Sequence, residues 1–366
     1  MNAPFVLAAG GTGGHLFPAQ ALAGELVRRG WRVVVMTDGR GHNYSSVFPG
    51  AEIQTVPAAT FAGRSALGKI AAFGVIALGV ASALLKLMNL RPRAVVGFGG
   101  YPSLPVMLAA SLVRVPAALH EQNAVPGRVN RLLAPRVKKI AATFPFVRLA
   151  PAHPERVVFT GNPVRAEAVA LRAAPYVAPD ASGPIRLLVF GGSQGARALS
   201  EIVPAALAQL LPDLRARLVI TQQCRQEDLE MVQSLYRAAG LRAEVAKFFT
   251  DLPRRMADAH LVIARSGAST LSELTVIGRP SILVPYPAAM DDHQAANAAV
   301  LENANAAWAI KQDKLTPQGL AGLLAEILTH PDMLTAHAAA AKALGHPDAA
   351  ARLADLAESL SESEAA

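Results

Sequence analysis

Two glycine-rich turns constrain this chain most, because each directly follows a short apolar run and leads into a helix-like stretch. The first turn, Gly10–His15, follows Phe5–Ala9, and the second, Gly191–Ala196, follows Ile185–Phe190. A strand that turns through glycines into a helix leaves backbone N–H groups exposed at the positive end of the helix dipole, where they can hold phosphate or a developing anion. Two such turns about half a chain apart predict a two-lobed enzyme with a cleft between the lobes.

The rest of the chain alternates strand-like runs with helix-like runs such as Pro18–Arg29, and the alternation restarts once, after Pro184. Further strand-like runs are Arg32–Met36, Ala94–Gly97, Ala117–His120, Val137–Thr143, Arg156–Thr160, Leu218–Thr221, Glu244–Phe248, Leu261–Ala264 and Ser281–Val284. This alternation is typical of doubly wound parallel sheets, and 366 residues exceed one typical core. We therefore predict an α/β protein with two Rossmann-like doubly wound parallel-sheet domains facing across a cleft.

The boundary between these domains is predicted at Gly161–Arg165, which is followed by a proline-rich stretch to Pro184. We expect an N-terminal domain over residues 1–163 and a C-terminal domain over residues 164–340. An alanine-rich helical tail, residues 341–366, is expected to pack on the N-terminal domain.

Composition excludes several classes of protein. With 17% charged and 52% hydrophobic residues, the chain is a folded protein with a generous apolar surface. The single cysteine, Cys224, excludes an intrachain disulfide and a cysteine metal cluster, and it fits a reducing cytoplasm. The first apolar run follows no basic residue and stops at the glycines, so we interpret it as a buried strand rather than a signal peptide.

Charge is distributed unevenly between the two halves. Residues 1–165 contain 18 Lys or Arg and 5 Asp or Glu, a net charge of +13, whereas residues 166–366 contain 17 and 22, a net charge of −5. A basic first half indicates that this lobe meets an anionic partner. Aromatic residues make up only 5% of the chain and do not alternate with basic ones, which argues against base stacking on nucleic acid. An anionic membrane surface or a phosphorylated lipid fits the charge.

The pattern of residues 64–93 indicates a helix that associates with a membrane. Between Lys69 and Lys86 lie 16 residues without a charge, with further basic residues on both sides. Spanning the hydrocarbon needs roughly 20 apolar residues, so a true span is one alternative and a buried core helix is another. A surface helix that dips into an anionic membrane also has this pattern. We favour peripheral attachment, because the charge asymmetry points the same way.

Six motifs occur in a characteristic order and spacing. They are Gly10–His15, His120–Asn123, Gly161–Arg165, Gly191–Ala196, Arg265–Ala268 and Asp292–Gln294. Together they resemble the MurG family of UDP-N-acetylglucosamine (UDP-GlcNAc) transferases, over essentially the whole chain. The resemblance implies a GT-B-type fold and inverting transfer of GlcNAc from UDP-GlcNAc to the C4 hydroxyl of the muramoyl sugar on undecaprenyl-diphospho-MurNAc-pentapeptide (lipid I). The product would be lipid II, the precursor of peptidoglycan, made by a peripheral enzyme on the cytoplasmic face of the cell inner membrane.

Inversion by a single displacement needs a base that removes the proton of the acceptor hydroxyl. His15 closes the first glycine-rich turn and titrates near neutral pH, so we predict it as this base; a structural histidine that caps the next helix is the alternative. Glu121 and His120, at the end of a strand, are rival bases or acceptor-binding residues. The residues predicted to contact the acceptor are Gly14, His15, Tyr101 and Glu121.

The donor is expected on the second lobe. Ser193 and the amides of the second glycine-rich turn are predicted to hold the diphosphate without a metal, although the glycines could simply let the helix approach the sheet. Glu273 can accept hydrogen bonds from both ribose hydroxyls; its alternative is an exposed helix residue. Arg165 offers a cationic contact at the hinge.

The family resemblance adds three donor contacts. It implies that Asn123 contacts the donor sugar, that Gln294 binds the donor, and that the backbone of Phe249 reads the uracil. The full predicted donor-binding set is Thr12, Gly13, Gly14, Asn123, Arg165, Ser193, Phe249, Ala268, Ser269, Thr270, Leu271, Ser272, Glu273 and Gln294. No Asp-X-Asp pair occurs in the chain, since Asp291 and Asp292 are directly adjacent, and we predict that no metal or other cofactor is required.

Three other functions share parts of this pattern. A nicotinamide oxidoreductase would use the glycine-rich turns as dinucleotide fingerprints, but neither turn completes Gly-X-Gly-X-X-Gly. A UDP-GlcNAc 2-epimerase of the same fold would need no basic, apolar first lobe. A non-catalytic membrane-binding scaffold would have no use for a nucleotide-sugar site. The transferase is therefore the function we expect.

Overall fold

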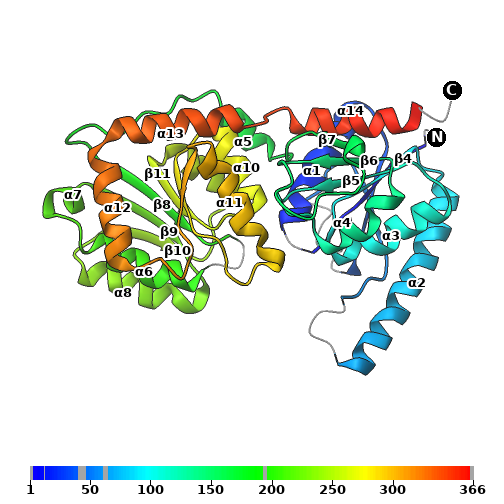
Figure 1. Ribbon diagram of the computed structural model, residues 1–366, viewed down its shortest axis with the longest axis horizontal. Coiled ribbons are helices and arrows are strands. Elements are labelled where there is room, and N and C mark those ends of the chain that lie inside the picture. Colours follow the sequence, from blue (N-terminus) through cyan, green and yellow to red (C-terminus); the bar gives the residue numbers. More distant parts are fainter. Residues whose placement is uncertain (1–2, 12, 40–46, 61–64, 193–195, 363–366) are drawn as a thin grey trace. The chain divides into compact units, whose positions relative to one another are not determined.

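A computed structural model describes residues 3–11, 13–39, 47–60, 65–192 and 196–362 (Figure 1). The chain divides into two compact units: unit 1 is residues 1–165 with 346–366, and unit 2 is residues 166–345. The chain leaves unit 1 after Arg165 and returns at His346, whereas the expected boundaries were residues 163 and 340. Each unit is built around one parallel sheet.

The sheet of unit 1 has seven strands in the order β3-β2-β1-β4-β5-β6-β7. They are β1 (Phe5–Ala8), β2 (Val33–Thr37), β3 (Glu52–Thr55), β4 (Ala94–Gly97), β5 (Ala117–Glu121), β6 (Lys139–Ala142) and β7 (Val157–Phe159). In the register, Val6 lies between Val34 and Val95 of the flanking strands. Helices cover both faces, so the central strands are buried throughout and consist almost wholly of apolar residues.

The sheet of unit 2 has six strands in the order β10-β9-β8-β11-β12-β13. They are β8 (Ile185–Phe190), β9 (Leu218–Gln223), β10 (Ala243–Ala246), β11 (Leu261–Ala264), β12 (Ser281–Leu283) and β13 (Ala307–Ala309). In both sheets the strand order reverses beside the first strand, between β1 and β4 and between β8 and β11. Ligands of doubly wound sheets bind at the carboxyl ends of the strands around such a reversal.

The helices of unit 1 are α1 (Gly13–Arg28), α2 (Ala66–Leu90), α3 (Gly100–Leu112), α4 (Arg128–Leu133) and α14 (Ala349–Glu362), with short 3₁₀ turns η2 (Ala134–Arg136) and η3 (Pro154–Arg156). Those of unit 2 are α5 (Ala166–Leu171), α6 (Arg197–Leu207), α7 (Pro212–Ala216), α8 (Leu229–Ala238), α9 (Leu252–Asp258), α10 (Ala268–Ile277), α11 (His293–Asn303), α12 (Pro317–Thr329) and α13 (Pro331–Leu344), with η4 (Gln226–Asp228) and η5 (Met290–Asp292).

The last helix, α14, belongs to unit 1. Leu353 and Leu360 are buried in the core of this unit beside α1. Arg29 at the end of α1 donates hydrogen bonds to Asp355 (2.6 Å) and Glu358 (3.1 Å) of α14. With this helix included, unit 1 contains 19 Lys or Arg against 10 Asp or Glu, and unit 2 contains 16 against 17. The excess of positive charge therefore lies in unit 1, although it is smaller than the N-terminal count alone indicated.

Helix α2 lies beside α3 and extends beyond the rest of unit 1 (Figure 1). It buries only one narrow stripe of its surface. The stripe faces α3. Within it, Gly79 packs so closely against the backbone at Pro57 that a Cβ on Gly79 would lie 2.0 Å from the Pro57 carbonyl oxygen. The other faces expose large apolar side chains: Leu67 (80%), Ile70 (69%), Phe73 (68%), Leu78 (67%), Leu85 (62%) and Met88 (55%). The alternative of a buried core helix is thus wrong, because only 28% of the most apolar 18-residue window is buried.

By length and hydropathy α2 could also cross a membrane. Its stripe of contacts with α3, however, makes it part of the folded surface of unit 1. An exposed apolar face of this size on a basic unit marks an interaction surface.

Candidate functional site

The first glycine-rich turn brings the starts of two helices together at the carboxyl edge of the first sheet. Gly11 has φ +92°, and α1 begins two residues later. Gly99 and Gly100, with φ +77° and +70°, lead from β4 into α3. A Cβ on Gly10 would lie 2.8 Å from the Pro102 Cβ, so the turn packs against the start of α3. Neither helix has an acidic residue in its first turn, so both positive ends favour an anion here.

His15, on the first turn of α1, is half-buried at this edge. Its Nδ1 lies 3.2 Å from Oε1 of Gln122. The other side of its ring lies against Gly100, where a Cβ would be 3.1 Å from the His15 Cδ2 and 3.3 Å from Nε2. Gly100 is therefore required both for its positive φ and for the space that the imidazole occupies.

His120 does not reach the surface. Its side chain is fully buried at the end of β5, and Nε2 lies 3.2 Å from the Gly161 carbonyl oxygen. Burial lowers the pKa of His120 to about 4, so the ring is neutral at physiological pH. The alternative in which His120 serves as the base requires an acceptor to reach a residue with no exposed surface, and the geometry argues against it.

Glu121 organises the loop that follows β5. It is 1% exposed, and both carboxylate oxygens already accept hydrogen bonds. Oε1 accepts from the backbone N (3.0 Å) and Nδ2 (3.3 Å) of Asn123, and Oε2 accepts from Gly127 N (2.8 Å) and Asn130 Nδ2 (2.7 Å). These contacts make Glu121 a support of the loop. Its role as a rival base that contacts the acceptor stays a prediction.

Tyr101 and Arg165 also lie in unit 1. Tyr101, on the first turn of α3, donates a hydrogen bond to Asp38 Oδ2 (2.8 Å) beyond the end of β2. The Arg165 guanidinium carbon lies 5.2 Å from the centre of the Phe17 ring on α1. Arg165 was expected in the second domain, but the structure includes it in unit 1, where it packs on α1.

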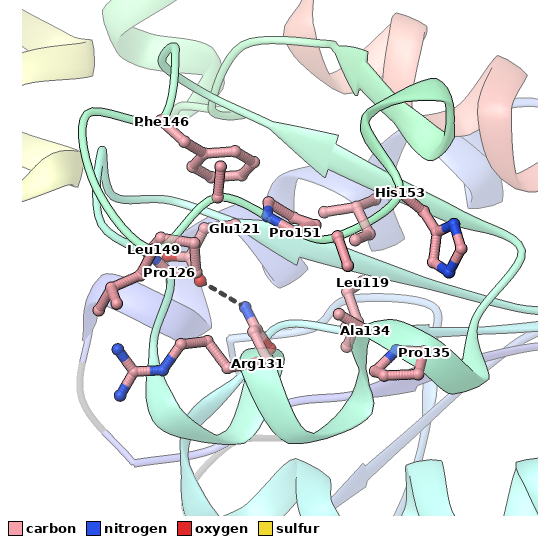
Figure 2. A pocket seen from close by; sticks show the side chains of 14 residues that line it. Leu119, Glu121, Pro126, Arg131, Ala134, Pro135, Phe146, Leu149, Pro151 and His153 are labelled. Atoms are coloured by element: carbon pink, nitrogen blue, oxygen red, sulfur yellow. Dashed lines mark hydrogen bonds between the residues drawn. The ribbon is translucent and has the colours of Figure 1, made fainter.

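A cavity of about 310 Å³ lies on the face of β5 that carries Leu119 and Glu121, opposite to His120 (Figure 2). Apolar residues such as Leu119, Phe146 and Leu149 form most of its wall, and Arg131 lies at its edge. The dashed line in Figure 2 is the hydrogen bond from Asn130 to Glu121 that ties this wall to the loop. This cavity was not predicted, because the segment 146–153 that lines it carries no motif.

In unit 2, the second glycine-rich turn follows β8. Gly192 has φ +78°, and a Cβ there would meet no atom within 4 Å. Residues 193–195 of this turn lie outside the described residues, so the predicted contacts of Ser193 stay predictions, as do those of Thr12 in the first turn. Helix α6 begins just after the turn, with no acidic residue in its first turn.

A second open helix start in unit 2 follows β11. Gly267 is the N-cap of α10, and a Cβ on it would meet nothing within 4 Å. The hydroxyl of Ser269, in the first turn, is buried without a hydrogen-bond partner. No acidic residue lies in this first turn. An anion placed at this helix start would meet free space, a positive helix end and an unsatisfied hydroxyl.

The predicted donor-binding residues that follow on α10 are buried, in contrast to the open start of the helix. Leu271 is fully buried and packs in the core, and Ser272 bonds to the Ala268 carbonyl oxygen (2.8 Å). Glu273 is only 5% exposed, so the alternative of an exposed helix residue is wrong. The open part of this predicted segment is therefore its first turn.

Gln294 links the segments that follow β11 and β12 at the carboxyl edge of the second sheet. Its backbone carbonyl oxygen accepts a hydrogen bond from Ser266 Oγ (2.8 Å), and its Oε1 accepts one from Tyr286 N (2.9 Å). Just before it, Asp291 and Asp292 have φ of +52° and +53°. Two consecutive non-glycine residues in the left-handed region are costly and occur mainly at functional sites.

Phe249 follows β10 and is 6% exposed, with the Arg255 guanidinium carbon 4.1 Å from its ring centre. Its side chain is thus occupied by packing. Within the described residues, no three His, Cys, Asp or Glu side chains are grouped so that they could hold a metal ion.

Comparisons with known proteins cover nearly the whole chain. Residues 5–142 match the glycosyltransferase family 28 N-terminal domain, and residues 186–353 match its C-terminal domain. A protein of Rhodospirillum rubrum, named UDP-N-acetylglucosamine–N-acetylmuramyl-(pentapeptide) pyrophosphoryl-undecaprenol N-acetylglucosamine transferase, is 51% identical over 97% of this chain and 92% of its own length. A crystal structure of Acinetobacter baumannii MurG is similar with a TM-score of 0.78 and 32% identity, over 97% of this chain and 99% of that one.

The chain belongs to the MurG family. Its fold is the two-domain GT-B fold of glycosyltransferases, as predicted. The same fold occurs in a UDP-GlcNAc 2-epimerase from Neisseria meningitidis, which is 14% identical with a TM-score of 0.66 over 96% of this chain and 98% of that one. At that identity the likeness concerns the fold alone.

For this MurG-family chain, the predicted site residues fall into two groups. In unit 1 the structure brings His15 and Tyr101 to the carboxyl edge, close to the loop that carries Asn123. In unit 2 the carboxyl edge carries the Gly192 turn and the start of α10. Gln122 was not predicted as a site residue, although its position close to His120 at a strand end was a usable signal.

Proposed function

We propose that the protein transfers GlcNAc from UDP-GlcNAc to the C4 hydroxyl of the muramoyl sugar of lipid I, which yields lipid II. The observation that carries this proposal is the 51% identity, over nearly the whole chain, to a protein named for that reaction.

Unit 1 binds the acceptor. The paired starts of α1 and α3 attract the diphosphate of lipid I, because two positive helix ends meet there without an acidic side chain in either first turn. His15 stands at this edge and takes the proton of the C4 hydroxyl as that oxygen attacks the anomeric carbon of the donor. Gly14 and Tyr101 border the same place and contact the acceptor.

Unit 2 binds the donor. The turn at Gly192 and the first turn of α10 hold the diphosphate of UDP-GlcNAc, and their N–H groups stabilise the negative charge of UDP as it leaves. Glu273 accepts the ribose hydroxyls, and Gln294 with the backbone of Phe249 contacts the nucleotide. Donor contacts from unit 1 are assigned to Gly13, Gly14, Asn123 and Arg165. Helix amides replace a metal ion in this role.

The protein attaches peripherally to the cytoplasmic face of the membrane through α2. The exposed apolar side chains of Ile70, Phe73 and Leu78 enter the lipid, and Lys69, Arg91 and Arg93 near the two ends of the helix meet anionic headgroups. This attachment gives unit 1 access to a prenyl-linked acceptor. Unit 2, with 16 Lys or Arg against 17 Asp or Glu, has no comparable excess of positive charge.

The reaction is tested by the fate of labelled donor. The purified protein is mixed with UDP-GlcNAc labelled in the sugar and with a lipid I analogue, and the products are separated. We expect the label in the lipid product, with free UDP as the second product. Label in UDP-N-acetylmannosamine, formed without the acceptor, would contradict the transferase and identify an epimerase.

The donor site is tested by Gly267→Ala. The backbone at Gly267 (φ −68°, ψ 142°) suits alanine, and the new Cβ meets no protein atom within 4 Å, so the fold should be retained. A diphosphate against the start of α10 would collide with that methyl group. We expect the KM for UDP-GlcNAc to rise by about tenfold, equivalent to about 1.4 kcal/mol, measured by initial rates at saturating acceptor.

Gly322→Ala is the matched control for this substitution. Gly322 lies on α12 of the same unit, and a Cβ there also meets nothing within 4 Å. This variant should keep the donor KM of the wild-type protein. An unchanged donor KM in Gly267→Ala would remove the start of α10 from the donor site.

A further inference from the structure

Gln122 connects two histidines beneath the edge of the first sheet. It is 2% exposed and follows β5, between the half-buried His15 and the fully buried His120. Its amide forms hydrogen bonds with both imidazole rings. The direction of each bond follows from neighbouring groups that can act only as donors or only as acceptors.

The first fixed point is the Gly161 carbonyl oxygen, which can only accept. Because His120 Nε2 lies 3.2 Å from it, Nε2 carries the proton. The ring is neutral, since burial lowers the pKa of His120 to about 4, and its Nδ1 is therefore left with a lone pair.

The second fixed point is the amide of Gln122. Its nitrogen is surrounded by three acceptors: His120 Nδ1 at 3.0 Å, the Phe98 carbonyl oxygen at 3.1 Å and the His120 carbonyl oxygen at 3.2 Å. Only the NH₂ group satisfies such a set. The carbonyl oxygen Oε1 is then the end of the amide that faces His15.

The third step concerns His15 itself. Oε1 of Gln122 can only accept, and His15 Nδ1 lies 3.2 Å from it, so Nδ1 carries the proton. We propose that Gln122 is a positioning residue that holds neutral His15 with its proton on Nδ1 and its lone pair on Nε2. A base needs such a lone pair, and Nε2 is the nitrogen beside Gly100 at the start of α3.

The inference deepens the proposed function, because it rests on His15 as the base of the transfer. When Nε2 takes the proton of the acceptor hydroxyl, the imidazolium still donates from Nδ1 to Gln122. The hydrogen bond to Gln122 therefore persists through the proton transfer, and the ring does not need to turn. Gln122 itself touches neither substrate in this scheme.

The test reads the tautomer directly. Protein labelled with ¹⁵N-histidine is examined by long-range ¹H–¹⁵N NMR above the pKa of free histidine, and the His15 signals are assigned by their loss in His15→Gln. In the wild-type protein we expect a protonated Nδ1 and an unprotonated Nε2 for His15. A wild-type His15 with its proton on Nε2 would overturn the proposal without any substitution at position 122.

The variant Gln122→Met provides a second test, through its His15 signals and its kinetic constants. It keeps the length of the side chain but removes the acceptor for His15, so the His15 signals should lose the fixed Nδ1–H form. We expect kcat to fall by about 10- to 100-fold while the KM for UDP-GlcNAc changes less than about twofold. Unchanged His15 signals in this variant would contradict the role of Gln122.

The positioning role of Gln122 and the role of His15 as base can be tested separately. If the His15 tautomer changes in Gln122→Met while kcat does not, Gln122 positions His15 as inferred but His15 is not the base. Loss of stability is monitored by Tm and compared with Tyr236→Phe, which removes a buried hydrogen bond to Gln222 in unit 2. The control should lower Tm and leave both the His15 signals and kcat unchanged.

Discussion

Replacing His15 with alanine is expected to lower kcat by about 100-fold or more, the usual contribution of a general base. In the proposed mechanism, the substitution removes the imidazole that receives the proton of the acceptor hydroxyl and leaves the proposed donor contacts of unit 2 intact. The KM for UDP-GlcNAc should therefore change less than about twofold. Initial rates with varied donor and saturating lipid I analogue give both constants.

His153→Ala is the matched control for this variant. His153 is an exposed histidine of unit 1 whose Nδ1 lies 3.1 Å from Oε1 of the nearby Glu155, and it is assigned no part in the reaction. Its replacement should leave kcat unchanged. A loss below about tenfold in His15→Ala would return the role to Glu121 or His120, which would then have to leave their buried positions.

The second large effect is expected at the membrane. Replacing Ile70, Phe73 and Leu78 together by glutamate should weaken binding to vesicles that contain anionic phospholipid by about 100-fold or more. Each apolar side chain that enters lipid contributes roughly 1.5–3 kcal/mol when fully buried, and each 1.4 kcal/mol is tenfold in affinity. The new carboxylates are also repelled by the anionic surface. Co-sedimentation with vesicles measures the change.

The control for this triple variant replaces three exposed apolar residues of unit 2, Val177, Leu211 and Val219, by glutamate. It alters charge and hydropathy by a similar amount away from α2 and should bind vesicles as the wild-type protein does. Both triple variants should still glycosylate a water-soluble acceptor analogue. Undiminished vesicle binding by the α2 variant would contradict attachment through this helix.

Most of the fold could be predicted because its central strands are buried on both faces. Runs such as Phe5–Ala8 and Leu261–Ala264 contain only apolar residues, a pattern that the sequence displays directly. The edge strand β3 was missed, since Glu52–Thr55 is polar and partly exposed. The three-residue β13 was missed as well, because it is too short to form a pattern.

The candidate site was predicted less completely than the fold. The glycine turns and His15 could be recognised from local sequence, because a strand, a turn and a helix follow one another in the chain. The burial of His120, Glu121 and Glu273 depends on segments distant in sequence, which no local pattern reveals. For the same reason the contact of Gln122 with His15, across 107 positions, could only be found in the structure.

The linkage of the sugar product shows whether the protein is an inverting transferase that acts on the C4 hydroxyl. The disaccharide that the wild-type protein makes from UDP-GlcNAc and a lipid I analogue is isolated, and its anomeric configuration and linkage position are determined by ¹H NMR. A single displacement assisted by His15 predicts GlcNAc attached to C4 of the muramoyl sugar with the configuration inverted from α to β. A product that retains the α configuration, or one linked at another hydroxyl, would contradict this account.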